Sequence, residues 1–414
     1  MTKKEDVNMK KVVSLFLALC LVMSVCVTAF AADSVEFWND KLGETEKGAA
    51  CITTWTAAAG VEIMNTNYPD TASYQTALTQ SIDVASAAPD IFTWWSGSQL
   101  ESLATSGKIQ PLDDVWETIV AAGVAPSIAD AFTFDGHAYA VPYSVLYNTC
   151  LYNTEDFAKA GIEAVPTTFD EFLAACDKLL AAGITPISLK NDSWASFIWF
   201  EALVAAYDPE LYNGVCDGSI AYTDDRMVEV MTIWQDMIAK GYFATPASYD
   251  DHTRRFATGE CAICIEPQML ATKVLDDYGV DSISAFVLPS MNGGKNVVFM
   301  EAAPMCVPTV CEDTDAAKAA LAAYYTPEVQ TVTASTDGII LIGGIECENE
   351  AVKTIANLPL DTEKNIVILR FYENTPSELR DVVLNEMARF MDNQADVQTT
   401  LEACQAKADE VFGK

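Results

Sequence analysis

The sequence predicts an α/β protein made of two or three globular units. The chain has 414 residues, and globular domains usually contain roughly 100 to 200 residues. Apolar residues make up 50% of the chain and charged residues 20%, as in proteins with large buried cores. Strand and helix patterns also alternate along the chain, and this order favours parallel sheets covered by helices.

The first elements alternate regularly. Short apolar runs predict strands at 35–38, 61–65 and 91–95, and helical periodicity separates them at 48–59 and 74–87. The third run ends in Trp94 and Trp95, just before Ser96 and Gly97. Ligands of open α/β sheets bind beyond the carboxyl ends of such strands, so we expect a functional edge here.

A second series of strands and helices follows. The pair Asp135-Gly136 predicts a hairpin turn. Thr168 and Glu171 form a capping-box pattern that begins a helix, and Gly183 ends it. The remaining patterns predict strands at 138–143, 145–152, 262–265, 286–288 and 303–307, and helices at 196–207, 227–240, 315–325 and from 377 to the C-terminus.

Residues 1–31 are typical of a secretory signal peptide. Lys10 and Lys11 precede an apolar run at 12–27, and a cleavage pattern of small residues ends at Ala31. The apolar run is shorter than the ~20 residues that cross a bilayer as a helix. We therefore expect an exported protein on the extracellular or periplasmic face of the bacterial cytoplasmic membrane.

Two questions about the leader stay open. Translation begins either at Met1 or at Met9, where a compact Met-Lys-Lys start stands. Cys26 keeps a lipid anchor as an alternative, although Val25 before it fits a lipidation site poorly.

The composition argues against several classes of function. Asp and Glu number 59 against 24 Lys and Arg, and the net charge of −35 repels nucleic acid. The two histidines, His137 and His252, are too few for a typical zinc site or catalytic triad, and we expect His252 at the surface. No phosphate-binding loop pattern occurs, so no nucleotide cofactor and no metal are expected.

Ten of the twelve cysteines follow the leader, and a disulfide framework is one interpretation. A chain of this length does not need disulfides for stability, however. Cys176 lies on an apolar helical stripe, and Cys261 and Cys264 lie in an apolar strand pattern, where residues three apart face opposite sides. We expect mostly buried thiols.

Several stretches then occur in a characteristic order: 89–97 (PDIFTWWSG), 107–114 (GKIQPLDD), 141–144 (VPYS), 151–157 (LYNTEDF), 166–172 (PTTFDEF), 181–186 (AAGITP) and 256–263 (FATGECAI). Together they resemble the extracellular solute-binding proteins of ABC importers, in the carbohydrate-binding branch that includes maltose-binding protein. This resemblance implies a two-lobe, type II periplasmic-binding-protein-like fold. Each lobe would contain a mostly parallel sheet flanked by helices, and hinge segments would cross between the lobes.

On this resemblance, lobe 1 would contain 32–142 and 289–335, and lobe 2 would contain 143–288 and 336–414. The crossings would lie near 142–145, 287–289 and 335–338. The implied function is a monomeric, non-enzymatic receptor. It would bind a sugar or oligosaccharide between the lobes and deliver it to ABC permease subunits in the membrane.

Binding a sugar requires flat apolar surfaces and planar polar side chains. Trp94, Trp194 and Asp192 resemble ligand contacts of the family, and Glu266 and Gln268 fall in a loop that lines its cleft. Strand alternation sends either Trp94 or Trp95 toward the core, so Trp95 is the alternative. Further candidates with structural alternatives are Tyr143 as a hinge wedge, and Glu301, Asn148 and Asn39 as solvated or capping residues.

Other functions remain open at this stage. One is a binding protein for a non-sugar solute, such as a polyamine, a metal chelate or a peptide. Another is a secreted glycoside hydrolase, which would need two carboxyl groups flanking the scissile bond. Turnover would separate the hydrolase from a receptor.

Overall fold

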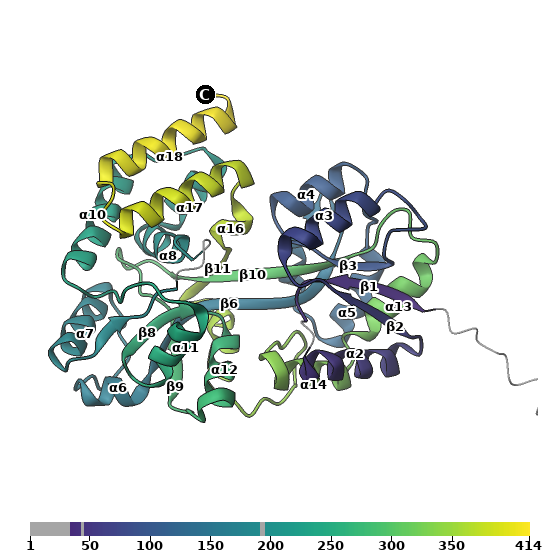
Figure 1. Cartoon of the computed structure of the whole chain (residues 1–414), viewed down its shortest axis with the longest axis horizontal. Helices are drawn as coiled ribbons and strands as arrows, with labels where there is room; N and C mark the ends of the chain where they lie inside the picture. The colour runs from purple at the N-terminus through teal and green to yellow at the C-terminus, as the bar shows by residue number, and fades with distance from the viewer. Residues whose placement is uncertain (1–33, 43–44, 191–194) are drawn as a thin grey trace, which may run out of the picture.

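The structure is a computed structural model that describes residues 34–42, 45–190 and 195–414 (Figure 1). The predicted signal peptide and the lipid-anchor alternative at Cys26 lie outside these residues. In the part that is described, no helix has both the length and the apolar composition to cross a membrane.

Two long strands join two globular lobes. Strands β6 (Val141–Asn153) and β10 (Asn296–Cys306) run side by side through the middle of the molecule (Figure 1). They pair antiparallel from Phe299↔Asn148 to Met305↔Val141. All the larger strands form one mixed sheet with the order β2-β1-β3-β10-β6-β8-β7, in which β11 also pairs with β10 and β9 with β6.

Lobe 1 is built on three parallel strands: β1 (Val35–Asn39), β2 (Ile63–Asn67) and β3 (Ile91–Thr93). Helices α3 and α4 cover one side of them, and α2 and α14 cover the other (Figure 1). A small hairpin, β4 (Thr133–Phe134) and β5 (His137–Ala138), follows the predicted turn. The helices are α2 (Glu46–Ala59), α3 (Thr71–Ser81), α4 (Ser98–Thr105), α5 (Asp113–Ala122), η1 (Pro126–Phe132), α13 (Thr314–Ala323) and α14 (Pro327–Asp337).

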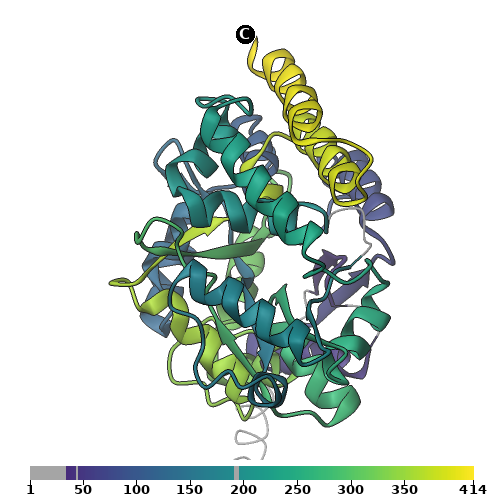
Figure 2. The same ribbon diagram turned by 90° about the vertical axis from the view of Figure 1, so that its left-hand side faces the viewer.

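Lobe 2 contains β7 (Thr185–Ile187), β8 (Cys261–Glu266), β9 (Ile283–Phe286) and β11 (Asn365–Leu369). Its helices cover both sides, and α17 and α18 pack together on the outside (Figure 2). They are α6 (Thr154–Lys159), α7 (Phe169–Ala181), α8 (Phe197–Tyr207), α9 (Pro209–Asp217), α10 (Asp225–Ala239), α11 (Tyr249–Ala257), α12 (Gln268–Tyr278), α15 (Glu350–Asn357), η2 (Leu358–Leu360), α16 (Phe371–Asn374), α17 (Ser377–Met391) and α18 (Val397–Phe412).

Strand direction places the carboxyl ends of the two sets of parallel strands toward each other. Strand β10 runs from lobe 2 into lobe 1, and β3 pairs antiparallel to it, so β1, β2 and β3 all run toward lobe 2. Strand β6 runs from lobe 1 into lobe 2. Strand β8 pairs antiparallel to β6, and β7 is parallel to β8, so both run toward lobe 1.

Two large apolar cores show where the chain crosses between lobes. Along β10, Val297 and Phe299 belong to the core of lobe 2, and Met300 belongs to that of lobe 1. Ile342 still packs in lobe 1, whereas Ala351 packs in lobe 2. The second and third crossings therefore come later in the sequence than the predicted segments 287–289 and 335–338. The lobe boundaries at 142/143, 288/289 and 335/336 stay a prediction.

The lobes also touch beside the crossing strands. Gly97, two residues after Trp95, lies so close to α16 that a Cβ atom there would collide with the carbonyl oxygen of Glu373. Its φ of 68° also favours glycine. On another side, the Lys47 ammonium lies 2.6 Å from Asp276 of α12.

Most predicted elements are present, with three corrections. The capping box of Thr168 and Glu171 begins α7 as predicted. The long C-terminal helix is two helices, because the chain turns at Asn393, where φ is 55°. The helix predicted at 74–87 ends at Ser81. His252 is buried rather than exposed.

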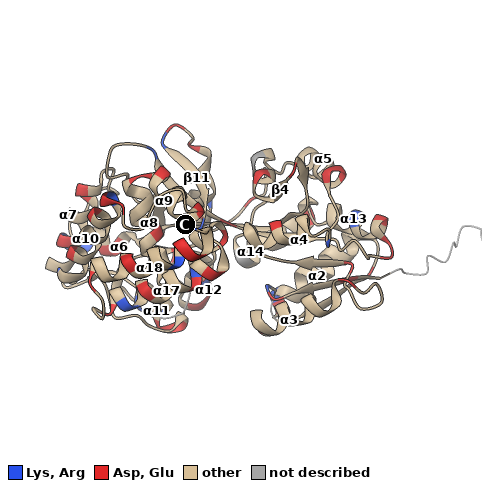
Figure 3. Ribbon diagram, turned by 90° about the horizontal axis from the view of Figure 1, so that it is seen from above, with Lys and Arg blue, Asp and Glu red and all other residues tan. Residues whose placement is uncertain are grey.

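Acidic residues are spread over both lobes, and basic ones are sparse (Figure 3). Nine of the ten cysteines that the structure describes are buried, which confirms the prediction of mostly buried thiols. Burial raises the pKa of several of them, for example that of Cys216 to about 12.

Candidate functional site

The candidate site is the region between the facing carboxyl ends of β1, β2 and β3 in lobe 1 and of β7 and β8 in lobe 2. Open α/β sheets bind ligands beyond these ends because the loops there are free to carry polar side chains. In this chain, the predicted residues Asn39, Trp94, Trp95 and Glu266 lie at such strand ends.

Asn39 ends β1, but its side chain holds the loop together. Its Oδ1 accepts hydrogen bonds from the backbone N–H groups of Lys41 (3.1 Å) and Leu42 (2.9 Å), and its Nδ2 donates to Asn65 Oδ1 at 2.6 Å. The residue is completely buried. These contacts favour a structural role for Asn39, and its contact with a ligand stays a prediction.

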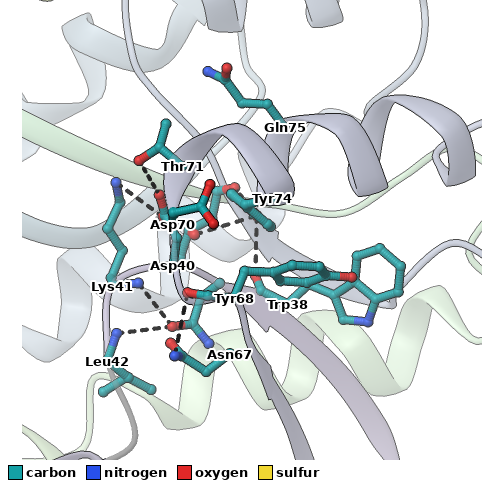
Figure 4. A network of polar contacts seen from close by, with 12 residues as sticks. Trp38, Asp40, Lys41, Leu42, Asn67, Tyr68, Asp70, Thr71, Tyr74 and Gln75 are labelled. Carbon is teal, nitrogen blue, oxygen red and sulfur yellow. Dashed lines mark hydrogen bonds and ion pairs between the residues drawn. The ribbon is translucent and has the colours of Figure 1, made fainter.

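The residues after Asn39 form a polar network with the start of α3 (Figure 4). Lys41 Nζ lies 3.2 Å from Asp40 Oδ1, and the hydroxyl of Thr71 donates to Asp40 Oδ2 at 3.0 Å. The Tyr74 hydroxyl contacts the carbonyl oxygens of Thr93 and Trp38, so it ties the ends of β1 and β3 together. Burial raises the pKa of Tyr74 well above its ordinary value.

Trp94 and Trp95 pack edge to face, with ring centroids 5.0 Å apart, and both also pack against Tyr74. Each is 8% exposed. The expected division into one core and one cleft residue is wrong, because β3 ends at Thr93 and strand alternation does not continue. The Lys41 ammonium lies 4.5 Å from the ring of Trp95. The indole N–H of Trp94 is buried, with no partner among the described residues.

In lobe 2, the ends of β7 and β8 carry a buried polar cluster. Lys190 Nζ lies 2.7 Å from Glu266 Oε1 and 3.0 Å from Oε2. His252 Nε2 lies 3.4 Å from the same carboxylate, and His252 Nδ1 is 2.8 Å from the Ser188 hydroxyl. Burial alone would raise the pKa of Glu266, but Lys190 and His252 outweigh it and lower that pKa below its ordinary value.

The sequence analysis identified Glu266 but missed Lys190 and misplaced His252. Lys190 follows β7 by three residues, and this position after a buried strand was the available signal. The predicted site residues Asp192 and Trp194 come shortly after Lys190 and lie outside the described residues.

Glu301 lies on the crossing strand β10, where Arg370 Nη1 pairs with it at 2.7 Å. Arg370 also pairs with Glu373 at 2.6 Å. Near them, the buried Glu201 accepts the backbone N–H of Phe371 at 2.7 Å. Burial raises the pKa of Glu201 well above its ordinary value, and it also raises that of Glu373. Glu301 therefore has a protein partner, and its role toward a ligand stays a prediction.

The side chains of three other predicted residues point into the protein interior. Tyr143 stacks on Tyr324 in the core of lobe 1, with ring centroids 5.7 Å apart, which fits its alternative as a hinge wedge. Asn148 is 6% exposed and borders a cavity of about 10 Å³, with its Nδ2 lacking a partner among the described residues. Both polar atoms of Gln268 are bonded to the backbone of β6. These contacts favour structural roles.

The described residues hold no group of His, Cys, Asp and Glu side chains suited to a metal ion. A larger groove of about 1180 Å³ lies in lobe 2, lined by the start of α7, the 290–296 loop and residues 361–365. No predicted site residue lines this groove, so it does not coincide with the facing strand ends.

Residues 44–331 match the family model of bacterial extracellular solute-binding proteins. The chain belongs to this family. A solute-binding relative, an uncharacterized ABC transporter extracellular-binding protein of Pyrococcus horikoshii, is 27% identical over 203 residues. That match covers 48% of this chain and 44% of the relative, so the chain spans less than half the length of that protein.

Solved structures of solute-binding proteins share the fold. A chitin oligosaccharide binding protein superposes with a TM-score of 0.79 at 22% identity, covering 92% of this chain and 99% of the other. The bacterial solute receptor AcbH, described as having an exclusive preference for β-D-galactopyranose, gives a TM-score of 0.77 at 19% identity, with the same coverage. The predicted two-lobe, type II periplasmic-binding-protein-like fold is thereby confirmed.

Proposed function

We propose that this chain is the extracytoplasmic receptor of an ABC importer. It binds a sugar or oligosaccharide between its two lobes and delivers it to the membrane permease. The observation that carries this proposal is the convergence of two sets of strand ends on one region, with the Trp94–Trp95 pair on one side and the Lys190–Glu266 pair on the other.

The chemistry of the strand ends suits a neutral, hydroxyl-rich ligand. Aromatic rings supply flat apolar surfaces for sugar C–H groups, and the unpartnered Trp94 N–H supplies a donor. The basic groups there are already neutralised: Lys41 pairs with Asp40, Lys190 with Glu266 and Arg370 with two glutamates. The site therefore has little excess positive charge for an anionic ligand.

A phosphorylated ligand is the main competitor. An sn-glycerol-3-phosphate-binding periplasmic protein of Yersinia pestis is 25% identical over 272 residues, which cover 61% of this chain and 59% of that protein. Arg380 is buried over the ring of Tyr372, and its Nη1 has no partner among the described residues. The Nη1 group of Arg380 can donate a hydrogen bond to a sugar hydroxyl as well as to a phosphate, so sn-glycerol-3-phosphate is included in the test.

Thermal unfolding against a ligand panel tests the proposal. The panel contains galactose, maltose, chitin and xylan oligosaccharides, sn-glycerol-3-phosphate, spermidine and a short peptide. A ligand at 100 times its Kd adds roughly 2.7 kcal/mol of stability, and we expect this for at least one sugar. Chromatography of the incubated sugar should give no product. A shift only with the phosphate, spermidine or the peptide contradicts the sugar assignment, and product formation contradicts the receptor.

Closure of the two lobes needs a separate measurement. We expect a smaller radius of gyration by small-angle scattering when the sugar is saturating, because ligand draws the lobes together. We also expect a monomer in solution. We expect the chain to be exported and then either released or held through Cys26 at the outer face of the cytoplasmic membrane.

A further inference from the structure

The pairing of β8 with β6 stops one step before the hinge region. Paired residues run from Tyr152↔Ile263 to Thr149↔Glu266. The same register would bring Pro267 opposite Asn148 and then Gln268 opposite Tyr147. However, Pro267 has no backbone N–H, and α12 begins at Gln268, so the backbone cannot continue the ladder.

The side chain of Gln268 takes the place of the missing strand. Its Oε1 accepts the backbone N–H of Tyr147 at 3.0 Å, and its Nε2 donates to the carbonyl oxygen of Val145 at 3.1 Å. The residue is 5% exposed, so these bonds are shielded from water. A carboxamide offers the same donor and acceptor as a peptide group, and it thus extends the ladder by one step.

On the lobe 1 side of this point, β6 is irregular. The register between β6 and β10 shifts between Ala303↔Ser144 and Pro304↔Pro142, which leaves Tyr143 as an extra residue. A bulge of this kind bends a strand and interrupts its ladder. The two prolines at the bulge cannot donate hydrogen bonds, so the ladder is weakest directly beside the segment that Gln268 holds.

The end of a lobe 1 helix also meets Gln268. Helix α14 of lobe 1 ends at Gly338, whose φ is 67°, and the chain then leads toward lobe 2. A Cβ atom on Gly338 would lie 3.4 Å from Cγ of Gln268 and 3.1 Å from the hydroxyl of Thr272. The end of α14 thus rests on the first turn of α12.

We propose that Gln268 is a hinge-positioning residue and not a ligand contact. Its carboxamide fastens β6 to α12 of lobe 2 at Val145 and Tyr147. These residues lie where β6 passes from the core of lobe 1, which includes Leu146, to that of lobe 2, which includes Cys150, so the carboxamide limits bending at this crossing. This inference deepens the proposed function, since it names a residue that limits how the receptor bends. Its test uses the ligand-free protein, so the two can fail independently.

The first measurement is amide hydrogen exchange of the unmutated protein and of Gln268→Met, which keeps the side-chain length and removes both polar atoms. The Tyr147 amide should exchange at least ten-fold faster in the variant. Gln330→Met is the matched control: Gln330 is fully buried in lobe 1, donates to the carbonyl of Tyr324 at 3.0 Å and accepts from the N–H of Leu341 at 3.1 Å. Gln330→Met should speed hydrogen exchange at the Leu341 amide and leave that of the Tyr147 amide unchanged.

The second measurement is the distance between the lobes. Spin labels at Thr53→Cys in α2 and Thr232→Cys in α10, both exposed positions, report it in a Cys311→Ser background, which removes the one described native cysteine that is not buried. Gln268→Met should broaden the distance distribution, and Gln330→Met should not.

Unchanged Tyr147 exchange and an unchanged distance distribution in Gln268→Met would overturn the proposal. Sugar binding that is lost while both stay unchanged would make Gln268 a ligand contact and leave the receptor function standing. If Gln268→Met does not fold, the unmutated protein still decides: a Tyr147 amide that exchanges as fast as an exposed amide overturns the proposal, and a slow one supports it.

Discussion

The ammonium of Lys190 and the carboxylate of Glu266 form an ion pair of 2.7 Å, with side-chain exposures of 3% and 4%. The pair joins the ends of β7 and β8, which are neighbouring strands of lobe 2. It therefore fixes two loops that we place at the ligand.

Removing one partner of this pair should be costly. Lys190→Met leaves a buried carboxylate whose remaining ion-pair partner among the described residues is His252, and we expect a loss of about 3–5 kcal/mol of unfolding free energy. Urea unfolding at neutral pH measures it. Lys353→Met, which frees the exposed Glu350, is the control and should cost much less, because water and salt screen an exposed pair. A similar loss in both variants would show that burial of the first pair has no special effect.

The same pair predicts acid sensitivity. Because the pKa of Glu266 is lowered in the folded protein, its contribution is fully present above the ordinary glutamate pKa of about 4.3 and is lost as pH falls through the lowered pKa. Urea titrations between neutral pH and that range should show a smaller acid-induced loss in Glu266→Gln than in the unmutated protein. An equal loss in the two proteins contradicts this prediction.

For Glu201 we predict the opposite pH dependence: its contribution to folding stability falls as the pH rises. Burial raises its pKa, so folding requires a proton when the pH is above the ordinary glutamate value. Between that value and the raised pKa, the unmutated protein should lose about 1.4 kcal/mol per pH unit relative to Glu201→Gln. Unfolding of both proteins at several pH values gives the difference, and parallel stability curves would rule the effect out.

The indole N–H of Trp94 should serve the ligand. Trp94→Phe keeps an aromatic ring and removes the donor, so the sugar with the largest thermal shift should bind about 2- to 10-fold more weakly, equivalent to one hydrogen bond of ~0.5–1.5 kcal/mol. Calorimetric titration measures the change. Trp234→Phe is the matched control, because the Trp234 N–H is also buried without a described partner, but Trp234 lies on α10 against Phe390 of α17 and not at the facing strand ends. Equal binding by all three proteins would place Trp94 in the core alone.

Affinity for the sugar should hardly depend on salt. A neutral ligand neutralises no charge of the protein, even at a net charge of −35, so screening has little to act on. We expect a Kd that stays within about two-fold between low and high ionic strength. A steep loss of affinity with added salt would indicate a charged ligand instead.

Local patterns predicted most of the strands, and they also led to the region that we propose as the site. Trp94, Trp95 and Glu266 follow apolar runs, and strand direction brings their loops to one region. Signals of this kind are contained within a few residues, so a single sequence is enough to find them.

Long-range partners were not predictable. Gln268 has a polar side chain at the right place, but the backbone of β6 uses both of its hydrogen-bonding groups, and sequence spacing does not indicate a partner 121 residues away. His252 was placed at the surface for the same reason, since its burial depends on Ser188 and Glu266 from two other strands. The pairs that fix these residues form only in the folded chain.

The cysteines have a consequence for how the protein matures. No disulfide bond links any two of the ten cysteines that the structure describes, and nine of them are packed in the interior. The fold then needs no oxidant and no disulfide-forming enzyme once the chain has left the cytoplasm. Such a receptor can fold and remain folded in cells that live without oxygen. Reducing agents in its surroundings leave the folded chain intact.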